Sequence, residues 1–307
     1  TVEAAFPNSI SFTSKNAAAF AENIFRLNNK FILIPGVRME YLEGAAAGRI
    51  GFDTNGSAIE LQNIRRSRSF IMAGIGAEYH IGASTEFYAN ITQAYRPIQF
   101  ANLQAPPGTD IIDPNLKDAR GYNFDIGYRG KFKDILKFDV SVFHLQYNNR
   151  VGVISTNGGA NRLVTNVGNS NSKGFESYVE CMPIKIFAKD SKYDLIVFTS
   201  YAYTNARYST DHKLAAIKGK KVENAPNHII RTGITLGINK FLCTAQVSYV
   251  GESFSDANNT LAPSLNATVG LIPAYTVSDL TFSYTFKKGI TCKSGINNLF
   301  NVAYFTR

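Results

Sequence analysis

Alternation of apolar and polar residues is the dominant pattern along this chain. From Ile71 to Tyr79 every second residue is apolar, and the residues between them, apart from Met72, are small or charged. The same period of two recurs in 31–41, 121–129, 229–238 and 241–249. A period of two is typical of β-strands whose two faces meet different environments. The chain is therefore predicted to be all-β.

The predicted strands are long. They run for about 10–14 residues, whereas strands of soluble sheets have about five or six and membrane strands need about 9–11. Twelve are predicted, at 16–27, 30–43, 67–80, 84–95, 119–131, 136–148, 171–183, 193–205, 227–238, 240–251, 274–286 and 289–299.

The connections between these strands alternate between short and long. Short turns are predicted at 28–29, 81–82, 130–135, 185–192, 239–240 and 287–289. Long links rich in Gly, Asn, Ser and Pro are predicted at 44–66, 96–118, 149–170, 206–226 and 252–273. Short turns on one rim and long links on the other, with aromatic residues near strand ends, are the layout of a transmembrane antiparallel β-barrel. Almost no helix is expected.

Charge and hydropathy fit this interpretation. The formal net charge is +9, but the basic residues are scattered apart from the run Arg65–Arg68, and no nucleic-acid-binding module is recognisable. No stretch approaches the roughly 18–20 apolar residues of a spanning helix. The mean hydropathy of -0.10 excludes only a helical membrane protein, because a barrel strand turns half of its residues away from lipid.

Catalytic and metal-binding patterns are absent from the sequence. The four histidines are far apart, and no nucleophile, phosphate-loop or paired-carboxylate motif is present, so neither an enzyme nor a bound cofactor is predicted. The three cysteines have no metal-site spacing. Strand parity directs Cys181, Cys243 and Cys292 towards lipid on strands that are not neighbours. We therefore expect three free thiols.

Five segments, in order along the chain, resemble one protein family. They are AENIFRL at 21–27 with LIPGVRME at 33–40, YRPIQF at 95–100, DPNLK at 113–117 with GYNFDIG at 121–127, SDANNT at 255–260 with GLIPAY at 270–275, and GINNLFN at 295–301. Together they resemble TonB-dependent receptors of the outer membrane, and within that family the ferric-citrate type. The last segment is the most specific of the five.

The resemblance implies a barrel of about 22 strands around an N-terminal plug. Residues 1–307 would form one partial barrel domain, and the plug, the TonB box, the early strands and the final strand would lie outside it. The implied location is the outer membrane of a Gram-negative cell. The implied function is import of a ferric siderophore, such as ferric citrate or a similar anionic iron chelate. The implied partners are that ligand, a TonB-type energy-coupling protein reached through the plug, and outer-membrane lipid and lipopolysaccharide.

Ligand-binding residues are expected on the long links, because the fork of arginine donors suits carboxylates. The resemblance adds Gln99, which matches a ligand-contacting Gln of the ferric-citrate receptor. The candidates are Arg96, Gln99, Arg65, Arg66 and Arg68, with Arg49, Arg150 and Arg162 as further loop arginines. Each could instead be a solvated loop charge or a lipopolysaccharide contact. Adjacent side chains alternate in extended chain, so Arg65 and Arg66 are not both expected to point inward.

Three alternatives remain open at this point. A passive porin or other outer-membrane barrel would share the strand pattern, but porins have about 16–18 strands. A TonB-dependent receptor for haem or another nutrient would share the scaffold and differ in ligand. A soluble all-β binding protein would leave the lipid-facing pattern unexplained.

Overall fold

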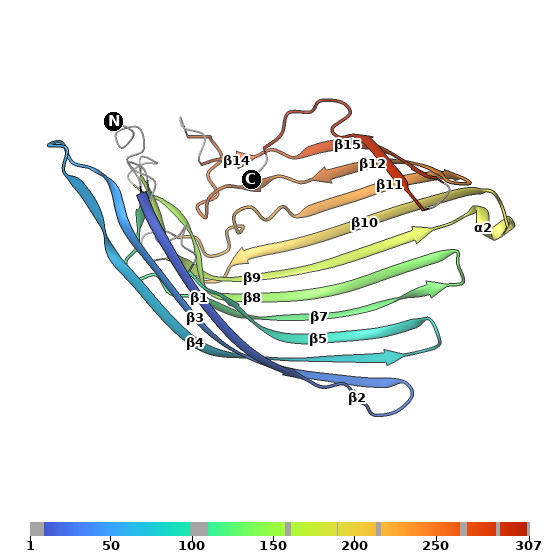
Figure 1. The fold of residues 1–307 in the computed structure, drawn as a ribbon, viewed down its shortest axis with the longest axis horizontal. Helices are drawn as coiled ribbons and strands as arrows, with labels where there is room; N and C mark the ends of the chain where they lie inside the picture. Colours follow the sequence, from blue (N-terminus) through green and yellow to red (C-terminus); the bar gives the residue numbers. More distant parts are fainter. Residues whose placement is uncertain are drawn as a thin grey trace.

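A computed structural model describes residues 9–98, 110–156, 161–188, 190–212, 216–264, 269–286 and 289–305. The main strands form one curved antiparallel sheet (Figure 1). Along the sheet they are β1 (Ser9–Glu22), β3 (Phe31–Phe52), β4 (Ala58–His80), β5 (Thr85–Arg96), β7 (Ala119–Phe132), β8 (Leu136–Thr156), β9 (Asn161–Cys181), β10 (Tyr193–Tyr208), β11 (His228–Ile238), β12 (Phe241–Val250), β15 (Tyr275–Thr285) and β16 (Thr291–Ile296).

These twelve strands correspond one to one to the twelve predicted from periodicity. Short turns gather on one rim, at the right of Figure 1, and the long links leave from the other. We call these the turn rim and the link rim. The short strands β2 (Phe25–Arg26) and β6 (Asp110–Ile112) join the same sheet, whereas β13 (Ser253–Phe254) and β14 (Leu271–Ile272) form a separate pair. The predicted topology is confirmed.

Two of the predicted long links are themselves largely strand, which corrects the expected boundaries. β3 continues to Phe52 and β4 begins at Ala58, so most of 44–66 is a hairpin that projects beyond the rest of the sheet (Figure 1). Likewise β8 and β9 extend through most of 149–170. Register shifts near Ala46 and Arg150 break the alternation in these arms. Such bulges hide a strand from a search for period two.

The turn rim is built from residues suited to tight turns. The side-chain oxygen of Asn28 accepts the backbone N–H groups of Lys30 and Phe31, at 2.8 and 2.9 Å. Asn239, in the two-residue turn between β11 and β12, has φ 55, a conformation that Asn tolerates better than most residues. The four-residue helix α2 (Ile184–Phe187) connects β9 to β10. Among the described residues no helix has the length and apolar character needed to cross a membrane.

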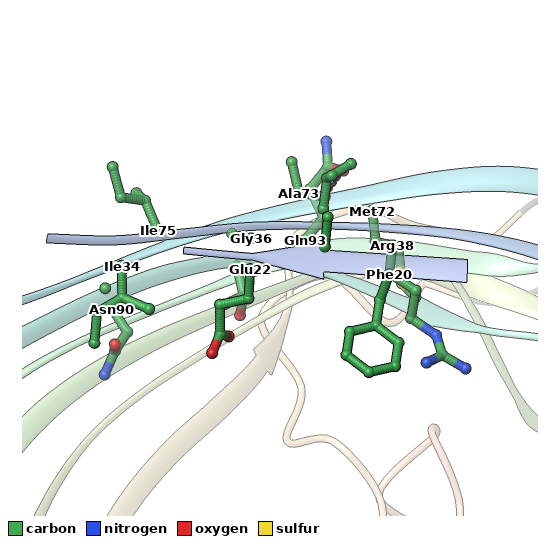
Figure 2. Close-up of a pocket in the computed structure, with 15 residues that line it drawn as sticks. Phe20, Glu22, Ile34, Gly36, Arg38, Met72, Ala73, Ile75, Asn90 and Gln93 are labelled. Carbon is green, nitrogen blue, oxygen red and sulfur yellow. Dashed lines mark hydrogen bonds between the residues drawn. The ribbon is translucent and has the colours of Figure 1, made fainter. Parts of the chain in front are cut away.

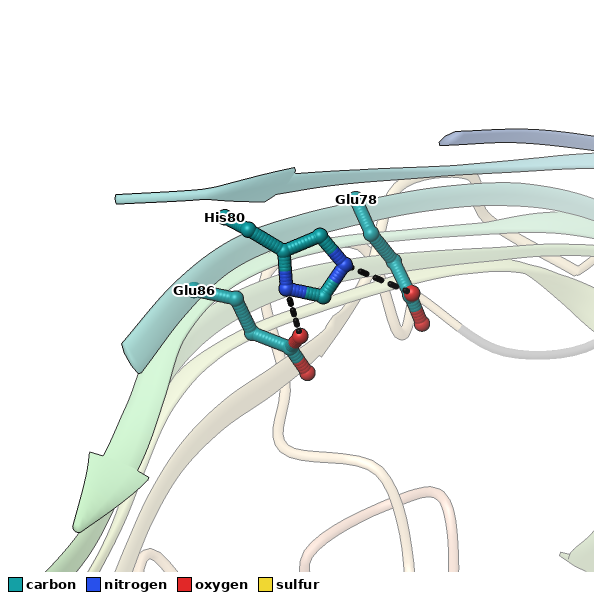
Figure 3. Close-up of side chains that lie close together, drawn as sticks. All are labelled: Glu78, His80 and Glu86. Carbon is teal, nitrogen blue, oxygen red and sulfur yellow. Dashed lines mark ion pairs between the residues drawn. The ribbon is translucent and has the colours of Figure 1, made fainter. Parts of the chain in front are cut away.

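The two faces of the sheet differ as the pattern predicted. Ile71, Ile75 and Tyr79 are exposed on the outward face. The alternate residues, such as Glu78 and His80, face the concave side (Figure 3). Cys181 and Cys243 are half-buried and Cys292 is exposed, and all three are free thiols, as predicted. The outward face is therefore an apolar surface, and the concave face carries the polar chemistry.

Side-chain packing is concentrated at the link rim. The buried hydrophobic cluster there comprises Ile154, Val167, Ala206, Tyr208, Ile217, Val222 and Ala257. Its members come from the outer ends of β8, β9 and β10 and from the links that follow β10 and β12. The links thus fold onto the rim as a small packed body, and we call it the rim core.

Candidate functional site

A pocket of about 630 Å³ opens beside the rim core. Its walls come from β5, β8, β9 and β10, from the link between β10 and β11, and from the link that follows β12. The residues that line it are Arg96, Phe143, Leu145, Arg150, Val151, Gly152, Val153, Val164, Ser172, Thr204, Ala206, Val222, Glu223, Asn224, Ala225 and Ser255. We call it the rim pocket. It brings Arg96, at the end of β5, together with Arg150 on β8, both of which are arginines named from the sequence.

The charges of the rim pocket are two arginines and one carboxylate. Arg150 Nε lies 3.6 Å from Glu223 Oε1, and both side chains are largely buried. The Tyr208 hydroxyl donates a hydrogen bond to Glu223 Oε2. Arg150 Nε is buried without a hydrogen-bond partner, so it is held against Glu223 by charge. Arg96 is exposed. The pocket thus carries a net positive charge and one accessible guanidinium, which suits an anion.

Arg66 and Arg68 lie on β4, not in a loop as expected, and they hold a neighbouring segment in place. Arg66 donates from Nη1 to the carbonyl of Leu116 at 2.9 Å and from Nη2 to that of Pro114 at 3.2 Å. Arg68 Nε lies 2.6 Å from Asp118 Oδ2. We call residues 110–118 the strap. Both guanidinium groups are engaged by the strap in this structure, and a role for either in ligand binding stays a prediction.

The strap has further attachments. β6, its first part, pairs in parallel with β9. The Asn166 side chain bonds both the N–H and the carbonyl of Lys117, at 2.7 and 2.8 Å. The Thr165 hydroxyl donates to Asp113 at 2.7 Å, and the Asn115 N–H donates to it at 2.8 Å. The Thr165 bond, and then the Asn115 bond, lower the pKa of Asp113 below its usual value. The strap is therefore fixed by several polar contacts, together with the buried side chain of Leu116.

Arg65 points away from Arg66. Its Nη2 lies 2.9 Å from each carboxylate oxygen of Glu43, and the pair stands on the outward face. The alternation predicted for these neighbouring arginines is confirmed. Gln99 lies outside the described residues, so its part in the site stays a prediction.

A second hollow, of about 570 Å³, lies on the wall where β1, β3, β4 and β5 meet (Figure 2). Glu22, Ile34 and Asn90 project from the face opposite to that of Ile75. Gly36, Gly74 and Gly76 form part of its lining, and their missing side chains leave the wall thin. Arg38 is paired with Glu40 at 2.8 Å. The hollow has few polar groups free to orient a small ligand.

A histidine cluster lies near the turn rim on the concave face (Figure 3). His80 stands between two carboxylates, with Nδ1 3.0 Å from Glu86 and Nε2 3.9 Å from Glu78. The three donor side chains are close enough to hold a metal ion. Arg129 already pairs with Glu86 at 2.6 Å and with Glu78 at 3.4 Å. His80 is far in sequence from the other histidines, and the signal for this cluster is instead Glu78 two residues before it and Glu86 across the short turn.

The family model described as TonB dependent receptor-like, beta-barrel, matches residues 3–299. The chain belongs to this family. Its relatives are outer-membrane proteins of Gram-negative bacteria, and the outward face described above is accordingly the lipid-facing surface. The family consists of receptors and transporters rather than enzymes.

Among curated proteins, the chain is 24% identical over 242 residues to the metal-pseudopaline receptor CntO of Pseudomonas aeruginosa. That match covers 76% of this chain and 30% of the receptor. The chain thus spans under a third of the length of the relative that it matches.

Solved structures show the same fold. The unliganded ferric citrate transporter FecA superposes with a TM-score of 0.72 at 18% identity, over 97% of this chain and 42% of FecA. The copper transporter OprC gives 0.72 at 17% identity, over 96% and 44% of the two chains. The siderophore receptor PiuA of Acinetobacter baumannii gives 0.70 at 16% identity, over 96% and 40%. At these identities the likeness supports the fold and leaves the ligand open.

Proposed function

We propose that the protein to which this chain belongs imports an anionic metal chelate across the outer membrane, and that ferric citrate or a similar carboxylate complex of iron is its ligand. The rim pocket carries the proposal. It opens at the link rim and it holds Arg96 and Arg150, and among its described lining residues Glu223 is the one carboxylate that offsets them. Family membership supports TonB-dependent energy coupling through a plug domain.

The ligand class rests on charge and geometry together. A ferric complex of citrate presents carboxylates around a compact anion, and arginine binds carboxylates through paired donors. Arg150 is held in one position by Glu223, so little conformational freedom would be lost when an anion arrives. Arg96 is exposed and can turn towards the ligand. Two named relatives, a metal-pseudopaline receptor and a ferric citrate transporter, are consistent with a metal chelate as cargo.

The test is a binding titration on the full-length receptor in detergent, with ferric citrate and haem as the two ligands. Arg96→Gln and Gln99→Ala should each weaken ferric citrate binding by about 1–3 kcal/mol, the range for a lost charged or neutral hydrogen bond. Arg150→Gln should weaken it by a similar amount. Arg38→Gln, on the wall and away from the rim pocket, is the matched control and should leave the affinity unchanged.

The possible outcomes test the binding site and the ligand separately from membership of the receptor family. Unchanged ferric citrate affinity in an Arg96→Gln, Arg150→Gln double variant would refute the rim pocket as the binding site. Tight binding of haem with none of ferric citrate would refute the carboxylate ligand and favour a haem receptor of the same family. Passive flux of unrelated solutes through the reconstituted protein, without energy coupling, would favour a porin.

A further inference from the structure

The outward face of β10, β11 and β12 changes character along its length. Towards the turn rim it is apolar, with Val197, Ile234 and Val247 exposed. Further along, Tyr203 and Tyr249 stand on the same face. The Tyr201 hydroxyl is 3.0 Å from His228 Nδ1, and the two rings stack. Next to the link rim the residues on this face are Asn205, Arg207 and Lys221. Apolar, aromatic and cationic zones thus follow one another in order.

The spacing of these zones matches the depth of a bilayer. Tyr193 and Tyr203 both face outward on β10 and are ten residues apart. At about 3.3 Å per residue they lie roughly 33 Å apart along the strand. A strand tilt of about 40° reduces this to roughly 25 Å along the membrane normal, the height of the apolar band between aromatic girdles. Arg207 stands four residues beyond Tyr203, at the level of the lipid headgroups.

A groove of about 380 Å³ lies at this level. Its polar lining includes Asn205, Arg207, Lys221, His228 and Glu252. We call it the outer groove. An isolated bridge places Arg207 beside Lys221. Arg207 is braced by bonds from Nη1 to the carbonyl of Gly219 at 2.7 Å and from Nε to Asn205 at 3.0 Å. Lys221 Nζ lies 3.7 Å from Glu252.

We propose that the outer groove binds the phosphorylated sugar headgroup of an outer-leaflet lipid of the lipopolysaccharide type. Two cations against one carboxylate leave a net positive charge at headgroup depth, and phosphate is the anion that lipids present there. The tyrosines below supply apolar surface for the start of the acyl chains. The groove opens on the outward face, whereas the rim pocket lies on the concave side, so this site is independent of the proposed import function.

The outward pair Arg65 and Glu43 shows why the outer groove is the better candidate. Arg65 donates two hydrogen bonds to Glu43 at 2.9 Å, and Lys15 Nζ lies 3.6 Å from the same carboxylate. The Glu43 side chain is only 12% exposed, so an arriving anion would have to displace a largely buried acidic partner. In the outer groove the carboxylate of Glu252 is more than half exposed and stands farther from its cation. An arriving phosphate could therefore compete with Glu252 for Lys221.

The experiment uses full-length receptor, stripped of lipid in detergent, and measures lipid binding by native mass spectrometry. The probes are hexa-acylated lipid A with two phosphates, the same lipid after dephosphorylation, and inorganic phosphate. Wild type should bind the phosphorylated lipid and neither of the other two at equal concentration. Lys221→Gln should weaken binding roughly tenfold, and an Arg207→Gln, Lys221→Gln variant more strongly, because charge-assisted bonds are lost.

Two further variants are expected to behave differently from the cation variants: one should bind lipid A more tightly, and the other should bind it like wild type. Glu252→Gln removes the competing carboxylate and should tighten lipid binding by roughly two- to fivefold, as expected for a partly exposed ion pair. A Lys192→Gln, Lys240→Gln variant makes the same charge change at the turn rim and should bind like wild type. Because Arg207 also bonds Gly219, the Lys221 and Glu252 variants keep the test valid if Arg207→Gln misfolds.

Three results would overturn the proposal. They are equal binding of the dephosphorylated lipid, full displacement of lipid A by equimolar inorganic phosphate, and equal losses in the groove variant and the turn-rim variant. The second result would identify a phosphate site with no preference for lipid. The third would indicate an unspecific charge effect.

Discussion

The wall and the rim core are held together by different forces. Along the wall, from β4 to β12, backbone ladders join the strands, and side chains on both faces remain exposed or half-buried. In the rim core, side chains such as Tyr208, Ile217 and Asp256 are completely enclosed. A membrane-spanning sheet needs every backbone group paired, but lipid can pack against its outer face. A rim that stands in water needs its own packed interior.

The largest expected effect comes from making one substitution in both regions. Ile217 is 0% exposed in the rim core and Ile234 is 47% exposed on the outward wall. Ile217→Ala should cost about 2–5 kcal/mol in local opening free energy, because it leaves a cavity. Ile234→Ala should cost about 1–2 kcal/mol, because lipid tails fill the space and only the transfer term is lost.

Hydrogen exchange read by mass spectrometry would measure both effects, since it reports local opening separately for each region. Both variants would be examined in full-length receptor reconstituted in vesicles. Equal protection losses in the two variants would show that the rim core has no tighter packing than the lipid-facing wall, and the contrast drawn here would fail.

Two aspartates, one buried and one exposed, allow a second comparison between a packed and a solvent-exposed part of the molecule. Asp256 is fully buried and accepts bonds from the N–H groups of Asn258 and Thr260 and from the Thr260 hydroxyl, at 2.8, 3.2 and 3.1 Å. Asp256→Ala should cost about 1–3 kcal/mol, because buried donors lose their acceptor. Asp53 bonds Asn55 and Ser57 at the exposed tip of the β3–β4 hairpin.

Asp53→Ala should have a smaller effect, under about 1 kcal/mol, because water can replace the carboxylate at an exposed site. Limited proteolysis followed by peptide mapping would compare cleavage after residues near 256–264 with cleavage at the hairpin tip. Faster cleavage at the tip alone, with the Asp256 variant resistant, would contradict a buried bonding role for Asp256.

The smallest effect concerns pH and the strap. The Thr165 and Asn115 bonds lower the pKa of Asp113. A depressed pKa means that the ionised carboxylate stabilises the folded strap, and that this contribution is lost as pH falls below the ordinary aspartate range of about 4. The change should be under about 1 kcal/mol because the site is partly solvated.

Exchange protection of residues 113–118 should therefore decline between about pH 5 and pH 3, the range that includes the ordinary aspartate pKa. Asp113→Asn should remove this decline while leaving protection at neutral pH only slightly reduced. An unchanged pH profile in the Asn variant would assign the decline to another group.

The wall could be predicted from sequence because its signal is local. Residues such as Ile71 and Tyr79 reveal their face through their immediate neighbours. The arms that extend β3, β4, β8 and β9 were missed because bulges near Ala46 and Arg150 interrupt the period of two. The existence of each strand could thus be predicted from the sequence more accurately than the length of the strand.

The rim could not be predicted in the same way. Arg66 bonds a carbonyl fifty residues away, at Leu116, and Arg150 on β8 meets Glu223 only because the link between β10 and β11 folds against that strand. Composition identified arginines that lie towards the link rim, and parity separated Arg65 from Arg66. The residues that these arginines contact depend on the paths of the links, and the alternation of apolar and polar residues carries no information about those paths. The sequence therefore indicated which arginines lie towards this rim, but not the partners that they contact.

The three cysteines have a consequence for the order of events during biogenesis. Cys181 ends β9, and Cys243 and Cys292 lie within the first three residues of β12 and β16, so all three are near the turn rim. Strands about 4.8 Å apart place β12 roughly 14 Å from β9 and 10 Å from β16, beyond the reach of a disulfide. Free thiols are at risk of mispairing in an oxidising periplasm, so we expect these three to be most vulnerable before the sheet forms. Insertion ends that exposure by separating the thiols and turning them to hydrocarbon, where thiolates are disfavoured.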